Sequence, residues 1–252
     1  QRLRKDQDPR RLARGTGLKL VAIYVSWFNV EKVGESSTLI KKTMVTHFVD
    51  YCVGEKYDII VLIEIHSALV KPIGSFLAEA YPDYTVTKTF GGKSNWYLSL
   101  ARNDTSRYVD AVTLKGLKRK VIHFSTSVKG GPVLNSYFAH FKSGQTTLTA
   151  SQLRNAAAKA QNDTGGTWLI GGDLNWDYSR SSELVLPENA ATFSSWGTET
   201  QRKGGLLDWA IFSNNLHVKA AGSGEFKRRF SDFDEMLGSD HKPVALQIGS
   251  GL

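Results

Sequence analysis

The pattern of apolar and polar residues along the chain predicts short strands that alternate with helices. Runs of apolar, often β-branched residues indicate buried strands, and apolar residues spaced three and four apart indicate helices that bury one face. The predicted strands cover residues 18–25, 57–65, 84–89, 96–101, 108–114, 120–126, 133–141, 168–172, 206–212 and 243–248. The predicted helices cover residues 39–53, 69–80 and 147–162.

Two stretches show little periodicity. We expect residues 179–205 to form a long loop with short helical pieces at most, and residues 222–229 to form a basic loop. No linker, short repeat or low-complexity tract interrupts residues 18–250. The alternation of strands and helices therefore favours one α/β domain with two packed sheets over residues 18–252. The arginine-rich residues 1–17 contain few apolar side chains and are expected to be a flexible basic tail or linker.

The composition says more about partners than about the fold. A chain of 252 residues, 41% of them apolar, can bury a sizeable core, and no apolar run reaches the roughly 18 residues of a membrane span. The net charge of +8 fits a polyanionic partner, such as nucleic acid or an anionic membrane surface, and it equally fits general solubility. The single cysteine, Cys52, excludes an internal disulfide and a cysteine-based metal site.

The stretch from Trp168 to Asn175 contains the clearest local signal. It reads WLIGGDLN, which predicts a short buried strand that runs into a glycine turn. Asp173 and Asn175 are two residues apart, so on an extended chain they share a face. The glycines would let another chain segment, a metal or a phosphate approach the backbone closely. A carboxylate beside an amide suits a hard cation or a phosphoryl oxygen.

Further polar residues follow or interrupt apolar strands. Asn29 follows the first predicted strand, and Glu31 comes two residues later. The others are Glu64, His140, Asp208, Asp240 and His241. Each alone has an ordinary structural explanation, such as an edge glutamate or a hydrogen-bonded core histidine. Because an unsatisfied buried charge costs several kcal/mol, so many together indicate that they satisfy one another through a metal and a substrate.

Five short motifs resemble those of the endonuclease/exonuclease/phosphatase superfamily in order and spacing. They are Ser26-Trp27-x-Asn29, Ile63-Glu64, Gly172-Asp173-Leu174-Asn175, Leu207-Asp208-Trp209 and Ser239-Asp240-His241-x-Pro243. The superfamily includes pancreatic deoxyribonuclease, abasic-site endonucleases, the catalytic subunit of cytolethal distending toxins, neutral sphingomyelinases and inositol-polyphosphate 5-phosphatases. The resemblance spans about residues 18–248 and implies an α/β fold, a DNase I-like four-layer α/β/β/α sandwich with two packed mixed sheets.

The resemblance implies a site for Mg²⁺ or Mn²⁺. It makes Glu64 the principal ligand, with Asn29 and Asp240 close by, and Glu31 a residue that supports the ligands from behind. Magnesium prefers oxygen ligands and keeps several waters, so it needs few protein carboxylates. In this superfamily the ion polarises the scissile phosphate and stabilises charge on the leaving oxygen.

The resemblance also implies the acid–base residues. His241 corresponds to the general base and acid, oriented by Asp208, while Asp173 and Asn175 would position the attacking water and the phosphate oxygens. His140 would be a second histidine that contacts the phosphate or the leaving group. Pancreatic deoxyribonuclease pairs that histidine with a glutamate from the preceding strand region, and residues 91–101 contain no glutamate here.

Several residues are candidates for contacts to phosphate or nucleic acid. Asn29, Asn175 and Arg119 would bind the substrate phosphate, with Lys118 and Arg107 as alternatives to Arg119. Trp96 and Tyr97 lie where nucleases of this superfamily contact sugar-phosphate or a base, although a strand aromatic is as readily a core residue. The basic residues Lys227, Arg228 and Arg229, interleaved with Phe226 and Phe230, would suit a phosphate backbone.

The leading prediction is an Mg²⁺-dependent endodeoxyribonuclease, a phosphodiester hydrolase acting on DNA as a monomeric catalytic domain without a transmembrane segment. The arginine-rich start and the missing first methionine further predict a processed or excised domain, such as a secreted or toxin-type nuclease accompanied by an inhibitor or immunity protein. The alternatives are a phosphatase or a sphingomyelinase-type phospholipase of the same fold, or a binding module without activity. The phospholipase would need an exposed apolar hairpin, and the binding module would lose central residues; the sequence shows neither.

Overall fold

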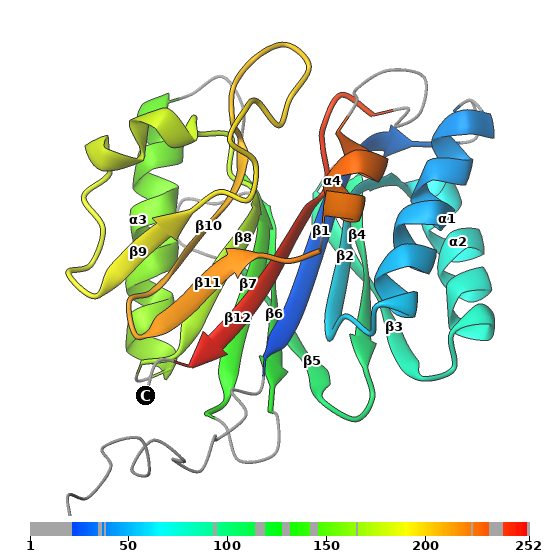
Figure 1. The fold of residues 1–252 in the computed structure, drawn as a ribbon, viewed down its shortest axis with the longest axis horizontal. Helices are drawn as coiled ribbons and strands as arrows, with labels where there is room; N and C mark the ends of the chain where they lie inside the picture. Colours follow the sequence, from blue (N-terminus) through cyan, green and yellow to red (C-terminus); the bar gives the residue numbers. More distant parts are fainter. Residues whose placement is uncertain are drawn as a thin grey trace, which may run out of the picture.

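Two six-stranded mixed sheets form the centre of the molecule (Figure 1). The computed structural model describes residues 22–250, apart from 35–36, 38, 93–94, 114–118, 128–131, 142–145, 165, 223 and 232–238, so the predicted tail over residues 1–17 lies outside the described part. Sheet A has the order β11-β12-β1-β2-β4-β3 and consists of β1 (Ile23–Val33), β2 (Ile59–His66), β3 (Tyr84–Gly92), β4 (Asn95–Arg102), β11 (Leu216–Ala220) and β12 (Val244–Ser250). Sheet B has the order β5-β6-β7-β8-β10-β9 and consists of β5 (Ser106–Thr113), β6 (Lys120–Thr126), β7 (Leu134–His140), β8 (Trp168–Asp173), β9 (Ala190–Phe193) and β10 (Asp208–Ser213).

Helices cover the outer faces of both sheets, which gives four layers (Figure 1). Helices α1 (Leu39–Gly54) and α2 (Ser67–Ala80) pack on sheet A, and α3 (Thr146–Thr164) packs on sheet B. A short helix, α4 (Gly224–Phe230), and a 3₁₀ segment, η2 (Tyr178–Glu183), complete the described helical elements. The predicted α/β/β/α sandwich is confirmed. None of the described helices combines the length and apolar character needed to span a membrane.

The core between the sheets explains why the strand sequences are so uniformly apolar. Strand β2 reads IIVLIEIH, and its first five residues are all buried because side chains on one face meet sheet B and those on the other meet the helices. Trp27 of β1 is fully buried and packs against Phe138 of β7, with ring centroids 5.9 Å apart. Large aromatic side chains of this kind supply much of the apolar area that holds two sheets together.

The two glycines of the WLIGGDLN stretch are places where another segment of chain comes very close. A Cβ built on Gly171 would lie 2.8 Å from the Trp27 ring, and one built on Gly172 would lie 2.0 Å from the carbonyl oxygen of Ala139. Gly172 also has a φ of +138°, a conformation that residues with a Cβ rarely adopt. The expected close approach to the backbone is therefore real, and the approaching groups are neighbouring protein segments.

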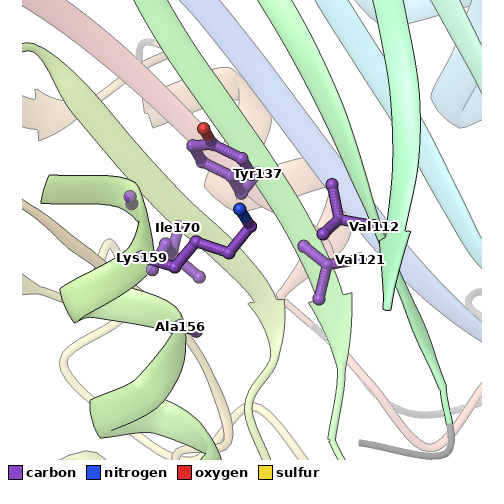
Figure 2. A pocket seen from close by; sticks show the side chains of 7 residues that line it. Val112, Val121, Tyr137, Ala156, Lys159 and Ile170 are labelled. Atoms are coloured by element: carbon purple, nitrogen blue, oxygen red, sulfur yellow. The ribbon is translucent and has the colours of Figure 1, made fainter. Parts of the chain in front are cut away.

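A void of about 10 Å³ lies between α3 and the outer face of sheet B (Figure 2). It is lined by Val112, Val121, Tyr137, Ala156, Lys159, Ala160 and Ile170. The stem of Lys159 extends over these apolar groups, while its amino group forms an ion pair with Asp163, with Nζ and Oδ2 2.5 Å apart. A space this small holds one water at most, so it is a packing gap and not a ligand site.

Four elements differ from the sequence-based prediction. Strand β1 continues to Val33, so Asn29 and Glu31 lie within it rather than after it; the strand extends because β1 pairs with β2 as far as Val33 and Ile65. Strands β9 and β11 were not predicted, and β9 lies in the expected long loop. Residues 224–229 of the predicted basic loop form α4 together with Phe230, since Phe226 and Phe230 are four residues apart and bury the same helix face.

Candidate active site

A cleft of about 490 Å³ opens at the end of the sandwich where β1, β2, β7 and β8 finish. Its lining comes from both sheets and consists of Asn29, Glu31, Lys32, Glu64, Asn95, Arg119, His140, Asp173, Asn175, Gln201, Lys203, Asp240 and His241. The residues predicted to act in catalysis, to hold the metal or, with Arg119, to bind the phosphate are all in this set except Asp208, which is fully buried behind His241. Residues that are far apart along the chain thus share one cleft.

Strand register places three of the polar residues side by side in sheet B. His140 of β7 lies opposite Asp173 of β8, and Asp173 lies opposite Asp208 of β10. Sheet A meets this row through Asn29, whose Nδ2 donates a hydrogen bond to Asp173 Oδ2 at 2.9 Å. A hydrogen bond between the two sheets therefore passes through the centre of the site.

The backbone bends at the two places where sheet A supplies acids to the cleft. The pairing of β1 with β2 shifts register between Asn29 and Val33, and Glu31 and Lys32 have φ values of +48° and +56°. Glu64 has a φ of +66°, where the pairing of β2 with β4 also shifts register. Such conformations cost about 1–3 kcal/mol each and persist where the surroundings hold them in place. They direct Glu31 and Glu64 into the cleft.

His241 and Asp208 form a tight buried pair. His241 Nδ1 lies 2.7 Å from Asp208 Oδ2, while Nε2 faces the cleft, 3.7 Å from Asp173 Oδ2 and 3.6 Å from Asp240 Oδ1. Burial lowers the pKa of His241, but the carboxylates of Asp208, Asp173 and Asp240 outweigh burial and raise it to about 10. The protonated ring is thus the favoured form in this carboxylate-rich setting.

Asp173 is the carboxylate that residues of both sheets contact in the cleft. Its Oδ1 accepts hydrogen bonds from the backbone N–H and the side-chain Nδ2 of Asn175, at 3.1 and 2.8 Å, which confirms that the two side chains point the same way. The second hydrogen on Asn175 Nδ2 goes to the carbonyl of Phe141 at 2.9 Å. Burial, with a further contribution from Asp208, raises the pKa of Asp173 to about 7 despite the opposing charge of His241.

His140 lies between two acids. Its Nδ1 is 3.4 Å from Glu64 Oε1, and its Nε2 is 3.4 Å from Asp173 Oδ2. Burial and the positive charges of Arg119, His241 and Lys32 hold the pKa of His140 well below its usual value of 6.5, so the ring is neutral. The glutamate beside this histidine is thus Glu64 from β2, and residues 91–101 contain none.

Arg119 is held at the edge of the cleft by backbone carbonyls. Its guanidinium donates to the carbonyl oxygens of His140 and Phe141 at 3.3 and 3.1 Å. These bonds fix the side chain and leave further N–H donors for a ligand. Of the two alternatives, Arg107 is exposed on β5 and does not line the cleft, and Lys118 lies outside the described residues.

Other predicted contact residues have structural partners. The Tyr97 hydroxyl donates to the carbonyl of Lys120 at 3.0 Å and accepts the backbone N–H of His140 at 2.9 Å, so it holds the two sheets together. Trp96 packs edge-on against Phe90, with ring centroids 5.4 Å apart. Phe226 and Phe230 are buried beneath α4, and neither they nor the basic residues of this helix line the cleft.

Sequence reasoning missed five residues in or beside the cleft. They are Lys32, Asn95, Thr200, Gln201 and Lys203. Gln201 Nε2 lies 3.4 Å from Asp240 Oδ2, and the Gln201 backbone pairs with His241. Thr200 and Gln201 fall in the aperiodic stretch, where no local signal marks them, because their partners are distant along the chain.

Thr200 ties the two halves of the Asp208–His241 pair to each other. Its fully buried Oγ1 accepts the backbone N–H groups of Leu207 and Asp208, each at 2.9 Å, and its carbonyl accepts the N–H of Lys242 at 2.8 Å. We expect Thr200→Val to lower the free energy of unfolding by about 2 kcal/mol, because two buried N–H groups lose their acceptor. Urea unfolding measures this, with Thr200→Ser, which keeps the oxygen, as the control. Equal stability of the valine and serine variants would contradict the assignment.

Comparison with known proteins rests on structure. No family model matches the sequence, and a search of curated proteins finds no significant match. Among solved structures, an endonuclease/exonuclease/phosphatase from Bacteroides vulgatus is 12% identical, with a TM-score of 0.69 over 91% of this chain and 99% of that one. D. rerio TDP2 complexed with a single-strand DNA product is 14% identical, with a TM-score of 0.68 over 91% and 99%.

A third similar structure is ANGEL2, described as a 2′,3′-cyclic phosphatase, in complex with adenosine-2′,3′-vanadate. It is 11% identical, with a TM-score of 0.67 over 92% of this chain and 96% of that one. In all three cases the similarity covers nearly the whole of both chains, and the identity is low enough that it concerns the fold alone. The chain has the four-layer fold of the endonuclease/exonuclease/phosphatase superfamily.

Proposed function

We propose that this protein is a divalent-metal-dependent phosphodiesterase that hydrolyses the DNA backbone. The observation that carries the proposal is the Asp208–His241 pair, with a 2.7 Å contact, whose free ring nitrogen faces Asp173 and Asp240 across a cleft that also holds Glu64 and Arg119. A buried acid–imidazole pair beside several carboxylates and a fixed guanidinium suits phosphoryl chemistry, in which proton transfer and charge neutralisation dominate.

The oxygen atoms in the cleft fit Mg²⁺ or Mn²⁺. Asp240 Oδ1 is buried and has no hydrogen-bond partner among the described residues, and burial raises the pKa of Glu64 although the positive charges of Arg119, Lys32 and His241 oppose the shift. We assign Glu64, Asn29 and Asp240 as the residues that would hold the ion, with Glu31 behind them. When bound, such an ion polarises the phosphate and stabilises charge on the leaving oxygen.

Asp173, Asp208 and His241 form a second group of potential metal ligands, which we consider less suitable. Atoms of Asp173, Asp208 and His241 lie within 4.8 Å of one another and could also surround a metal. However, Asp208 Oδ2 and His241 Nδ1 already bond to each other, which occupies one ligand atom of each. A hard ion that prefers oxygen is therefore better served by Glu64 and Asp240, and the pair stays available for proton transfer.

The remaining residues have separate tasks in the proposed reaction. Asp208 holds the Nδ1 proton of His241, so Nε2 is the atom that exchanges a proton with the substrate or water. Asp173, whose pKa is about 7, is the carboxylate that orients the attacking water and accepts its proton. Neutral His140 and the fixed Arg119 donate to the phosphate oxygens. Asn175 positions the carboxylate of Asp173, since both of its amide hydrogens are already engaged in hydrogen bonds. Asn29 of sheet A donates to the other oxygen of the same carboxylate.

DNA is the substrate that we favour, because the net charge is +8, Lys32, Arg119 and Lys203 line the cleft, and a structure of the same fold holds a single-strand DNA product. The alternative function is that of a phosphatase, and the structural similarity to a 2′,3′-cyclic phosphatase supports it. The expectation of a secreted or toxin-type nuclease with an inhibitor or immunity partner stays a prediction.

A cleavage panel tests the proposal. We expect the purified protein to cut plasmid DNA with Mg²⁺ or Mn²⁺ and to stop when EDTA removes the ion, while Asp208→Ala is inactive. The matched control is Asp110→Ala. Asp110 on β5 forms another acid–histidine pair with His123 on β6, with Oδ1 and Nδ1 3.4 Å apart, and neither residue lines the cleft. Intact DNA together with phosphate release from a cyclic or terminal phosphate would favour the phosphatase. Intact DNA, RNA and phosphate esters across both ions would contradict the proposal.

A further inference from the structure

We infer that Asn95 is a positioning residue that fixes the carboxylate of Glu64 for metal binding, a role that rests on the proposed metal-dependent function. Asn95 is the first residue of β4 and lines the cleft. Its Nδ2 donates a hydrogen bond to Glu64 Oε1 at 2.7 Å. No motif in the sequence marks this residue, and its importance follows from the contact alone.

Glu64 needs an external support because the sheet does not hold it. The backbone of Glu64 is left-handed, and the ladder between β2 and β4 is irregular between Leu62 and Ile65. The regular pairing resumes at Ile65 with Trp96 and at His66 with Asn95. Asn95 therefore sits at the second paired position beyond the irregularity, from which its short side chain reaches back to Glu64.

The two neighbours of Glu64 approach the same oxygen atom. Asn95 Nδ2 lies 2.7 Å from Oε1, and His140 Nδ1 lies 3.4 Å from that same atom. The hydrogen bond from Asn95 holds Oε1, with the longer His140 contact beside it, and leaves Oε2 for an ion. Partners that hold a metal-binding side chain in this way often matter nearly as much as the ligands themselves.

An amide suits this position better than a charged group. A lysine would neutralise Glu64 and compete with a cation, and a second carboxylate would repel it. The neutral amide donates a hydrogen bond and leaves the charge on Glu64 intact. The other end of the amide, Asn95 Oδ1, is buried and has no hydrogen-bond partner among the described residues. An asparagine that served only to fasten the hairpin would satisfy both ends, and here the acceptor end is left without such a partner.

The test measures ion binding separately from activity. Isothermal titration with Mn²⁺ gives the dissociation constant for the wild type, Asn95→Ala, Asn95→Ser and Glu64→Gln, and thermal unfolding without ion checks that each variant folds. We expect both Asn95 variants to bind Mn²⁺ about 10-fold or more weakly at an unchanged melting temperature, and DNA cleavage to recover when the ion is raised to saturation. The matched control is Asn103→Ala in the turn at the other end of β4, whose amide bonds Pro82 and Thr85 and should leave the affinity unchanged.

The outcomes separate this inference from the proposed function. Folded Asn95 variants that bind Mn²⁺ within twofold of the wild type would overturn the positioning role. Weaker binding by Asn95→Ala with no DNA cleavage by the wild type would support the positioning role and overturn the nuclease. Equal binding by the wild type and Glu64→Gln would overturn the positioning role together with the assignment of Glu64 as a metal ligand.

Discussion

Replacing His241 with alanine is expected to slow metal-dependent DNA cleavage by about 10²- to 10⁴-fold, the usual contribution of a positioned acid–base group. The ring lies 2.7 Å from Asp208 on one side and presents Nε2 to the cleft on the other. No second imidazole can take its place, because His140 has both ring nitrogens beside acids and its pKa lies far below the usual value. Initial rates on plasmid DNA at saturating Mg²⁺ measure the effect.

The control for this substitution is His123→Ala. His123 also lies near an aspartate, Asp110, and its ring stacks on Tyr137 with centroids 4.4 Å apart. It lies on β6, and it does not line the cleft. It should retain the wild-type rate. A His241→Ala protein that cuts DNA within tenfold of the wild type, or a His123→Ala protein that is equally slow, would remove His241 from the acid–base role.

Replacing Gly172 with alanine is expected to destabilise the protein by about 4 kcal/mol or more, which would leave a domain of ordinary stability largely unfolded. The new Cβ would lie 2.0 Å from the Ala139 carbonyl oxygen, in the middle of the parallel pairing of β7 with β8. Neither strand can move aside without shifting His140 or Asp173, which follow directly. Urea or thermal unfolding, with soluble yield, measures the loss.

The control is Gly166→Ala, which separates the effect of a steric clash from the effect of backbone strain. Gly166 has a φ of +147°, close to that of Gly172, but a Cβ there would meet nothing within 4 Å. It should therefore show only the cost of the left-handed conformation, about 1–3 kcal/mol. If the two variants were equally stable, the close approach of Ala139 would not be the reason for the glycine.

The parts of this molecule that sequence reasoning reached are those encoded locally. The buried strand β2 and the strand in the WLIGGDLN stretch, β8, could be predicted because burial on both faces requires continuous apolar residues. The acids and imidazoles of the site stood out for the opposite reason, since a charge inside such a run needs a partner. Hence Glu64, Asp173 and His241 were found without knowledge of which residues meet in space.

The parts it missed depend on partners that are distant along the chain. Strand β11 is a short, half-exposed segment, and it forms only because β12 offers an edge for pairing between Val218 and Ile248. The aromatic residues of α4 were interpreted as ligand contacts, yet Phe230 packs against Phe48 of α1, with ring centroids 5.9 Å apart. Asn95 and Thr200 are ordinary polar residues in the sequence, and only the fold reveals what they hold.

The strand order has a consequence for synthesis on the ribosome. Sheet B is built from one continuous stretch, residues 106–213, whereas sheet A combines residues 23–102 with β11 and β12 from residues 216–250. Strand β12 pairs with β1, so the first described strand waits for the last one, and Asp240 and His241 emerge just before it. Within this domain, a nascent chain therefore carries Glu64 and Asp173 before it carries His241, and it lacks the proposed acid–base imidazole until the strand that completes sheet A is being made.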